Sequence, residues 1–371
     1  MQVISHPIRE SFEKKHGKID DLRSFTHGSA HSGDWISVTT TLFNSNDGLV
    51  YLGLTDMSGD IFYAMDPATG KSECLDYLSI RAKNEVKIHR SLQIAPDGKL
   101  CAGSAGLIDV RTRDESPGGQ IWIYDPETRK YRVLGIPAEH DYVQHVTYDF
   151  ERQLVYGATY PVPFFFVYDM TCRVTRRKTY IGAYPHRTVI ADDGTVWTGY
   201  GMSADIANGL NMMMSYNPGT DEITWHEWSL PAVGQAGDNC QLDDAVNLGD
   251  GYLYFATVNG GFSRMDQKSG ELEWLGKPAR GMRICGIDEG SDGLIYLATG
   301  ANYGLKGDDG LCGVWSFDRK TGHFANHGVL RDQNGDECAS VHSLTIGDDG
   351  RIWIGETDNG KRSGFLWECR L

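Results

Sequence analysis

The feature that most constrains this chain is a sequence repeat of about fifty residues that recurs along its length. Each copy holds an alternating apolar run, a hairpin turn, a second run, and a third run that ends in a turn similar to Tyr-Asp-Pro-x-Thr-Gly. Six closing turns are centred on Asp66, Asp125, Asp169, Asn217, Asp266 and Asp318. Because such a period is the signature of a repeat architecture, we expect residues 1–371 to form a single domain.

The hairpin turn inside the repeat unit occurs seven times. One copy is a degenerate Glu151-Arg152, and six are Asp-Gly pairs that begin at Asp47, Asp97, Asp193, Asp250, Asp292 and Asp349. Asp-Gly between runs of Val, Ile, Tyr and Trp is a hairpin signal, and the 45 glycines of the chain agree with many turns. Each unit has room for four short strands, so the sequence predicts an all-β, seven-bladed β-propeller.

The last unit stops before a fourth strand. We expect the N-terminal segment 1–26 to supply that strand and so to close the ring between the two ends of the chain. The seven blades are then expected to cover residues 27–80, 81–138, 139–182, 183–232, 233–278, 279–330 and 331–371.

Composition limits the partners of such a propeller. The chain has 35 Lys and Arg against 50 Asp and Glu, a net charge of −15, which argues against binding to nucleic acid or to an anionic membrane. An anionic ligand would need locally concentrated arginines. No apolar run approaches the roughly 18 residues of a spanning helix, and no apolar segment follows a basic start. Eight scattered cysteines without a C-x-x-C pair are typical of reduced thiols, so we expect a cytoplasmic protein.

Aligning the repeats on their hairpin turns brings four histidines into register, namely His89, His145, His186 and His342. The same position holds Asp243 in the fifth blade, Cys285 or its neighbour Arg283 in the sixth, and a threonine near Thr39 in the first. The inner strands of a propeller all begin at one mouth of the central channel. We therefore expect four imidazoles and a carboxylate to meet in one site.

Imidazole is both the commonest protein ligand for metals and a group that titrates near neutral pH. The four histidines are thus candidate acid–base catalysts and candidate ligands of a divalent metal such as Mn, Zn or Ca, and the sequence does not separate these roles. No nucleotide cofactor is expected. The competing interpretation is a structural histidine encoded by the repeat, but the histidines occur in only four of seven blades, which favours a shared site.

Residues near the histidines complete the candidate site. Arg90 and Arg187 each follow a histidine directly and are candidates for binding a substrate's negative charge, together with Asp243 and Tyr303. Tyr160 is either a proton donor or a packed aromatic at the rim. The pair formed by Asp243 and the next residue is either a pair of acid–base carboxylates or a turn that enters a strand.

This repeat, with histidines at the channel mouth and Tyr and Arg on nearby loops, resembles the propeller lyases, a group that includes oligogalacturonate, ulvan and streptogramin lyases. The resemblance lies in architecture and no complete family motif matches. It implies a carbon–oxygen lyase that performs β-elimination on a small uronate-containing oligosaccharide. In such a reaction a histidine or tyrosine removes the proton alpha to the carboxylate, while arginines or a metal stabilise the developing charge.

Two other functions fit the same site. A glycoside or lactone hydrolase would use a metal-bound water or Asp243 and would give a product without a new double bond. A non-catalytic propeller would bind a ligand or a protein, and replacing its histidines would change only affinity or nothing. The sequence does not determine the oligomeric state.

Overall fold

The structure of the protein is a computed structural model that describes residues 1–8, 36–56, 59–106, 110–201, 210–234, 238–279, 283–300, 311–359 and 362–371. Strands dominate it, and the helices in these ranges are the short 3₁₀ segments η1 (Tyr77–Ser79) and η2 (Val110–Glu115). The predicted all-β class is confirmed. Within the same ranges, no helix has the length and apolar character needed to cross a membrane.

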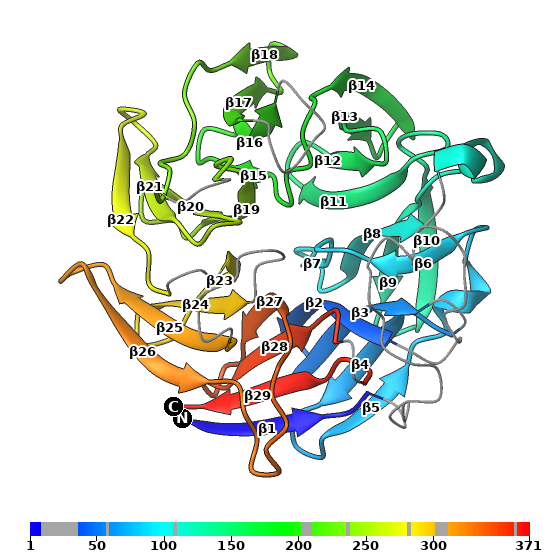
Figure 1. Cartoon of the computed structure of the whole chain (residues 1–371). Helices are drawn as coiled ribbons and strands as arrows, with labels where there is room; N and C mark the ends of the chain where they lie inside the picture. Colours follow the sequence, from blue (N-terminus) through cyan, green and yellow to red (C-terminus); the bar gives the residue numbers. More distant parts are fainter. Residues whose placement is uncertain are drawn as a thin grey trace.

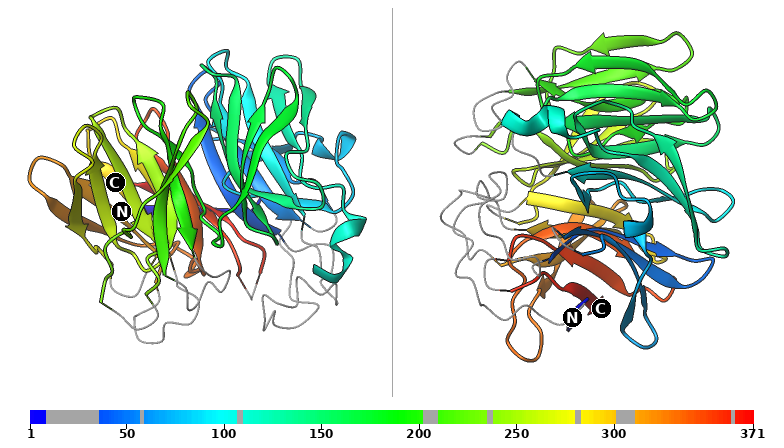
Figure 2. Two further views of the ribbon diagram at one scale, coloured as in Figure 1. Left: turned by 90° about the horizontal axis from the view of Figure 1, so that it is seen from above. Right: turned by 90° about the vertical axis from the view of Figure 1, so that its right-hand side faces the viewer.

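The sheets form a ring around a common axis (Figure 1). Their strands run between the two faces of the ring, as the perpendicular views of Figure 2 show. The first three blades contain β2 (Ile36–Asn44), β3 (Leu49–Asp56), β4 (Phe62–Asp66), β5 (Lys71–Cys74), β6 (Glu85–Ile88), β7 (Gln93–Ile94), β8 (Leu100–Gly106), β9 (Ile121–Asp125), β10 (Lys130–Gly135), β11 (Tyr142–Asp149), β12 (Leu154–Tyr160), β13 (Phe164–Asp169) and β14 (Val174–Tyr180).

Four further groups of strands complete the ring, which begins with β1 (Gln2–His6) and ends with the C-terminal strand. They contain β15 (Val189–Ile190), β16 (Val196–Gly201), β17 (Asn211–Asn217), β18 (Glu222–Trp225), β19 (Leu242–Asn247), β20 (Tyr252–Thr257), β21 (Phe262–Asp266), β22 (Leu272–Gly276), β23 (Arg283–Glu289), β24 (Ile295–Gly300), β25 (Gly313–Asp318), β26 (His323–Val329), β27 (Val341–Ile346), β28 (Ile352–Glu356) and β29 (Leu366–Arg370).

Antiparallel pairing joins these strands into six sheets among the described residues. Five sheets have four strands each. The sixth has nine, because β6 bridges the group β2 to β5 and the group β7 to β10. Counting those two groups separately gives seven units of four strands, which is consistent with the seven predicted blades.

The ring is closed as predicted by the N-terminal strand. β1 pairs antiparallel with β29, from Gln2 opposite Arg370 to His6 opposite Leu366. Two side-chain contacts anchor β1: Ser5 Oγ donates to Asp332 Oδ2, in the segment after β26, at 2.7 Å, and His6 Nε2 lies 2.9 Å from Glu368 Oε2 of β29. The two termini therefore lie side by side in the last blade (Figure 1).

The Asp-Gly hairpins follow from local chemistry. The glycines of all six pairs have φ between 72° and 89°, a conformation that glycine adopts without steric cost. In each pair the preceding aspartate accepts a hydrogen bond through Oδ1 from the backbone N–H two residues on, at 2.8–3.3 Å. The turn thus satisfies its own backbone, which explains why the repeat keeps these two residues.

The hydrophobic core lies between neighbouring blades. One cluster, for example, packs Tyr156 and Phe165 of the third blade against Val196 and Tyr216 of the fourth. Each such side chain is almost fully buried, and burying one contributes about 1.5–3 kcal/mol to stability. This packing makes the inner ends of the strands a rigid frame for the channel.

Candidate functional site

A β-bulge recurs in the inner strands of the ring. Where β2, β11, β19, β23 and β27 pair with the next strand, the register shifts by one residue. The residues left without a cross-strand partner are Thr39, Gln144, Asp243, Cys285 and His342. Bulges bend a strand and redirect a side chain, and they are common next to active sites. Here they lie where five blades meet around the channel.

His89 and His342 form a close pair across the channel. Their Nε2 atoms are 3.0 Å apart and their rings meet edge to face. His89 Nδ1 donates to Gln144 O at 2.6 Å, and His342 Nδ1 donates to Thr39 O at 2.8 Å. A carbonyl oxygen only accepts hydrogen bonds, so both Nδ1 atoms carry a proton. Both Nε2 atoms then present lone pairs to each other.

Two facing lone pairs at this distance repel unless an electron-poor centre lies between them. A shared proton would make the pair an imidazole and an imidazolium. A divalent cation bound by both Nε2 atoms would serve equally, and a backbone carbonyl on the other ring nitrogen is the usual support of a metal-binding histidine. The pair is therefore the candidate position for a shared proton or for a metal ion.

Asp243 is the hub of a second set of contacts. It is fully buried, and its carboxylate accepts from Arg90 Nη1 at 2.8 Å and from Arg283 Nε at 2.7 Å. His186 Nδ1 donates to Asp243 Oδ1 at 2.8 Å. The two arginines and the histidine outweigh burial and hold the pKa of Asp243 well below its usual range. Asp243 thus remains a carboxylate that orients His186.

The Asp243 contact leaves His186 Nε2 as the basic position of that ring. This nitrogen has no hydrogen-bond partner among the described residues, and the side chain is 16% exposed. His186 also contacts the ring of His89, with 5.6 Å between ring centroids. An accessible lone pair beside the histidine pair is the arrangement expected of a general base.

All the imidazoles are held neutral. Burial lowers the pKa of His186 to about 4, with Arg90 and Arg283 adding to the effect against Asp243. Burial and neighbouring cations likewise hold the pKa of His89 and His342 well below the usual range. An anion bound here would favour the imidazolium forms and raise these pKa values.

The arginines differ in accessibility. The side chains of Arg90 and Arg283 are 3% and 7% exposed and are paired with Asp243. Arg187 is 32% exposed; its Nε lies 3.2 Å from Asp244 Oδ1, and its Nη1 donates to Arg90 O at 3.0 Å. Arg187 is therefore the arginine of this cluster that is placed to meet a ligand. One nitrogen of Arg90, Nη2, is buried without a partner among the described residues.

The structure brings most, but not all, of the predicted residues together. His89, His186, His342, Arg90 and Asp243 are joined by the contacts above. His145 lies one residue past its bulge, because Gln144 takes the bulged position, and its Nε2 atom is 2.6 Å from Thr188 Oγ1. Its pKa is held well below the usual range by burial.

The structure describes one of the two candidate tyrosines, Tyr160 and Tyr303. Tyr160 packs against the rings of Tyr142 and Tyr184, at 4.9 and 5.1 Å between centroids. Burial raises its pKa, and none of its described contacts is to a histidine. Its part in proton transfer stays a prediction. Tyr303 lies outside the described residues.

Sequence reasoning missed two participants. Gln144 supplies the carbonyl that fixes the tautomer of His89, and the charge of Lys87 contributes to the lowered pKa of His89 and His342. Two signals were available: Gln144 lies directly before a candidate histidine, and Lys87 lies two residues before another on the same strand.

The described residues provide only some of the ligands that the predicted metal ion needs. His89 and His342 offer two converging nitrogens, but the described residues contain no group of three or more His, Cys, Asp and Glu side chains that could hold a metal ion. These two residues are the ones that would hold the ion, with the remaining ligands from substrate or water. The eight cysteines are free thiols, and burial raises the pKa of Cys285 to about 12.

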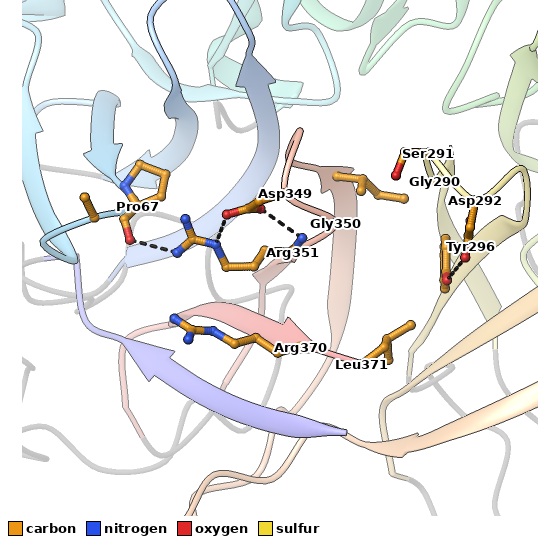
Figure 3. Close-up of a pocket in the computed structure, with 12 residues that line it drawn as sticks. Pro67, Gly290, Ser291, Asp292, Tyr296, Asp349, Gly350, Arg351, Arg370 and Leu371 are labelled. Carbon is orange, nitrogen blue, oxygen red and sulfur yellow. Dashed lines mark hydrogen bonds and ion pairs between the residues drawn. The ribbon is translucent and has the colours of Figure 1, made fainter.

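A separate hollow of about 690 Å³ lies at the other end of the inner strands, by the hairpins of Asp292 and Asp349 (Figure 3). Its arginines are already paired. Arg351 bonds to Asp349 and to Pro67 O, and Arg370 bonds to Glu368. We therefore place the candidate site at the histidine end.

No protein-family model matches the chain, and no curated protein matches it. Among solved structures, streptogramin B lyase is similar, with a TM-score of 0.56 and 14% identity over 99% of this chain and 97% of that one. The WD40 repeats of RRP9 are similar with a TM-score of 0.57 and 10% identity, over 91% and 95% of the two chains.

An extracellular domain from B. thetaiotaomicron, assigned to a hybrid two-component system, is also similar. Its TM-score is 0.57 with 10% identity, and the match covers 91% of this chain but only 38% of that one. These likenesses show the β-propeller fold, and at such low identity they show the fold alone.

Proposed function

We propose that the channel mouth is the active site of a carbon–oxygen lyase that cleaves a uronate-containing oligosaccharide by β-elimination. The observation that carries this proposal is an accessible imidazole nitrogen, His186 Nε2, beside a histidine pair and an arginine cluster. Base, acid and cation are the three groups that elimination next to a carboxylate needs. Streptogramin B lyase, a structural neighbour, is itself named a lyase.

The hydrogen bonds of each residue indicate its role in the proposed reaction. Arg187 binds the substrate carboxylate and stabilises the charge that develops on it. His186 Nε2 removes the proton from the alpha carbon, while Asp243 accepts from Nδ1 and stabilises the resulting imidazolium. The bond between the beta carbon and the leaving oxygen breaks as a carbon–carbon double bond forms. The leaving oxygen takes up a proton from the His186 imidazolium or from water.

Substrate binding activates this base. Free His186 is a weak base because its pKa is lowered to about 4 by burial and by two arginines. A carboxylate bound at Arg187 adds negative charge and raises the pKa of the imidazole, so proton abstraction becomes favourable only with substrate in place. A divalent metal on His89 and His342 would supply further electrostatic stabilisation of the carboxylate.

The test is to incubate the protein with uronate oligosaccharides and to follow the ultraviolet absorbance of an unsaturated product. We expect His186→Ala to lower kcat by about a hundredfold or more, the usual contribution of a general base. The matched control is His323→Ala, because His323 is exposed on the outer strand β26. Metal content is measured on the same samples before and after chelation.

The outcomes are distinct. An unsaturated product that is lost with His186→Ala and kept with His323→Ala supports the lyase. Cleavage to a saturated product would move the function to a hydrolase at the same site. No cleavage of any uronate would overturn the proposal and leave a ligand-binding propeller.

A further inference from the structure

Three tyrosines without a role in the mechanism above lie side by side at the histidine end of the strands. Tyr142 begins β11 and Tyr160 ends β12, and the two residues are cross-strand partners. Their ring centroids are 4.9 Å apart, and the ring of Tyr184 follows at 5.1 Å from that of Tyr160. Neighbouring ring planes are tilted by 35° and 47°. The three side chains therefore form a continuous row of rings, which we call the tyrosine row.

Hydrogen bonds to the fifth blade hold one end of the tyrosine row beside the candidate base. Gln241 Nε2 donates to Tyr184 O at 2.8 Å. Two residues further along both segments, Asp243 Oδ1 accepts from His186 Nδ1 at 2.8 Å. Between these two contacts, the backbone N–H of His186 donates to Leu242 O at 3.3 Å. The segment that carries Tyr184 and His186 is thus fixed at three points, and the row begins two residues from the base.

Only one of the three tyrosine hydroxyls is used within the chain. Tyr184 Oη donates to Pro161 O at 2.9 Å. The hydroxyls of Tyr142 and Tyr160 have no hydrogen-bond partner among the described residues, although Tyr142 is only 6% exposed. A buried tyrosine hydroxyl usually has a partner, because leaving it unpaired costs free energy. Two hydroxyls of the row are therefore available to a group from outside the chain.

The surroundings of the tyrosine row offer no unpaired charge in the described part of the chain. Arg113 of η2 forms two hydrogen bonds with Asp141, from Nε to Oδ1 and from Nη2 to Oδ2, each at 2.7 Å. Asp141 directly precedes Tyr142, so this ion pair lies at the start of the row. No hydrogen bond joins the row to a charged side chain in the described ranges. The row therefore suits an uncharged part of a ligand, whereas Arg187 suits its carboxylate.

We propose that the tyrosine row is a subsite for the pyranose ring next to the uronate that Arg187 holds. A pyranose combines a C–H face, which packs against the electron-rich face of an aromatic ring, with hydroxyls that can bond to Tyr142 and Tyr160. A flat aromatic ligand would leave those two hydroxyls unpaired. The inference rests on the proposed function for the uronate. It makes Tyr160 a specificity-determining residue, which selects oligosaccharides over single sugars through the ring and not through its charge.

The experiment is calorimetry on the full-length His186→Gln protein, which binds without turnover. The ligands are galacturonate, digalacturonate and galactosyl-galacturonate, in which a hydroxymethyl group replaces the carboxylate of the non-reducing sugar. We expect both disaccharides to bind about tenfold more tightly than galacturonate, as one stacked ring provides. Tyr160→Ala abolishes this gain and leaves galacturonate affinity unchanged, and Tyr160→Phe lowers disaccharide affinity about threefold. Tyr252→Ala, in the Asp250 hairpin at the opposite end of the strands, is the matched control.

The results separate this inference from the proposed function. A disaccharide gain that survives Tyr160→Ala, or a gain confined to digalacturonate, overturns the subsite. Unchanged disaccharide affinity in Tyr160→Phe does the same, and this variant decides the case if circular dichroism shows that Tyr160→Ala is unfolded. Wild-type elimination of digalacturonate with an unchanged KM in Tyr160→Ala contradicts the inference alone. A gain that depends on Tyr160, without unsaturated product from the wild type, keeps the subsite and removes the lyase.

Discussion

At the scale of single residues, hydrogen-bond partners decide what each imidazole can do. Backbone carbonyls fix Nδ1 of His89 and His342 as donors, and the Asp243 carboxylate does the same for His186. The Nε2 atoms of His89 and His342 therefore face each other, and Nε2 is left as the basic nitrogen of His186. Roles that the sequence left inseparable become distinct: His186 is the candidate base, and His89 and His342 form a separate pair.

Because His186 is kept neutral in the folded protein, the protein is less stable at low pH. Its pKa is lowered to about 4 in the folded protein against about 6.5 in the unfolded chain. The unfolded state therefore binds the proton more tightly, so stability is full above pH 6.5 and is lost as the pH falls toward 4. For His186 alone the loss is about 3 kcal/mol.

We expect His186→Gln to flatten this pH dependence. The measurement is urea unfolding of the wild type and the variant at a series of pH values between 7 and 4, roughly the window set by the two pKa values. His323→Gln, on an exposed outer strand, should follow the wild type. Parallel curves for the wild type and His186→Gln would contradict the low pKa of His186.

At the scale of elements, the bulges and the close approach of neighbouring blades position the site. Gly286 follows the bulged Cys285 in β23 and lies against β27 of the next blade. A Cβ added there would be 2.5 Å from Leu344 Cβ and 2.6 Å from Leu344 N. Gly293, in the hairpin of the same blade, has φ 78° but open space around it.

This pair of glycines gives a matched prediction. Gly286→Ala forces two blades apart and should lower the free energy of unfolding by about 3 kcal/mol. Gly293→Ala meets only backbone strain and should lower it by about 1 kcal/mol. Chemical denaturation measures both. Equal effects would show that the blades do not approach as closely at Gly286 as described.

The turns were predictable from sequence because their chemistry is local. Asp292 and Gly293 satisfy their own hairpin, so the pattern marks the strand ends wherever it occurs. The bulge is less visible. In the third blade a missing residue at Glu151-Arg152 put His145 in register by alignment, whereas strand pairing assigns the bulge to Gln144. A one-residue slip is invisible to spacing alone.

At the scale of the whole molecule, the site depends on contacts between distant parts of the chain. Asp243 meets Arg90 and His89 meets His342 only because the ring brings their blades together. The alignment of the repeats predicted that these residues lie at one mouth of the central channel. It could not show that Arg90 is paired with Asp243, since this contact is a property of the closed ring.

Closure of the ring should matter accordingly. Deleting residues 1–7 removes β1, exposes the edge of β29 and takes away one of the partners of Glu368. We expect a lower Tm and association between molecules through the exposed strand edge, detected by thermal unfolding and by size-exclusion chromatography. Ser5→Ala, which removes one hydrogen bond to Asp332, is the mild control. A truncated protein with unchanged Tm would contradict closure through β1.

The central claim is that the histidine mouth performs elimination, and the most direct measurement is product analysis in heavy-oxygen water. The protein is incubated with digalacturonate and the products are analysed by mass spectrometry and ultraviolet absorbance. Elimination predicts an unsaturated fragment that is lighter by one water than the corresponding fragment from hydrolysis, formed at a rate that falls with His186→Ala. Saturated products that carry heavy oxygen would contradict the claim and establish hydrolysis instead.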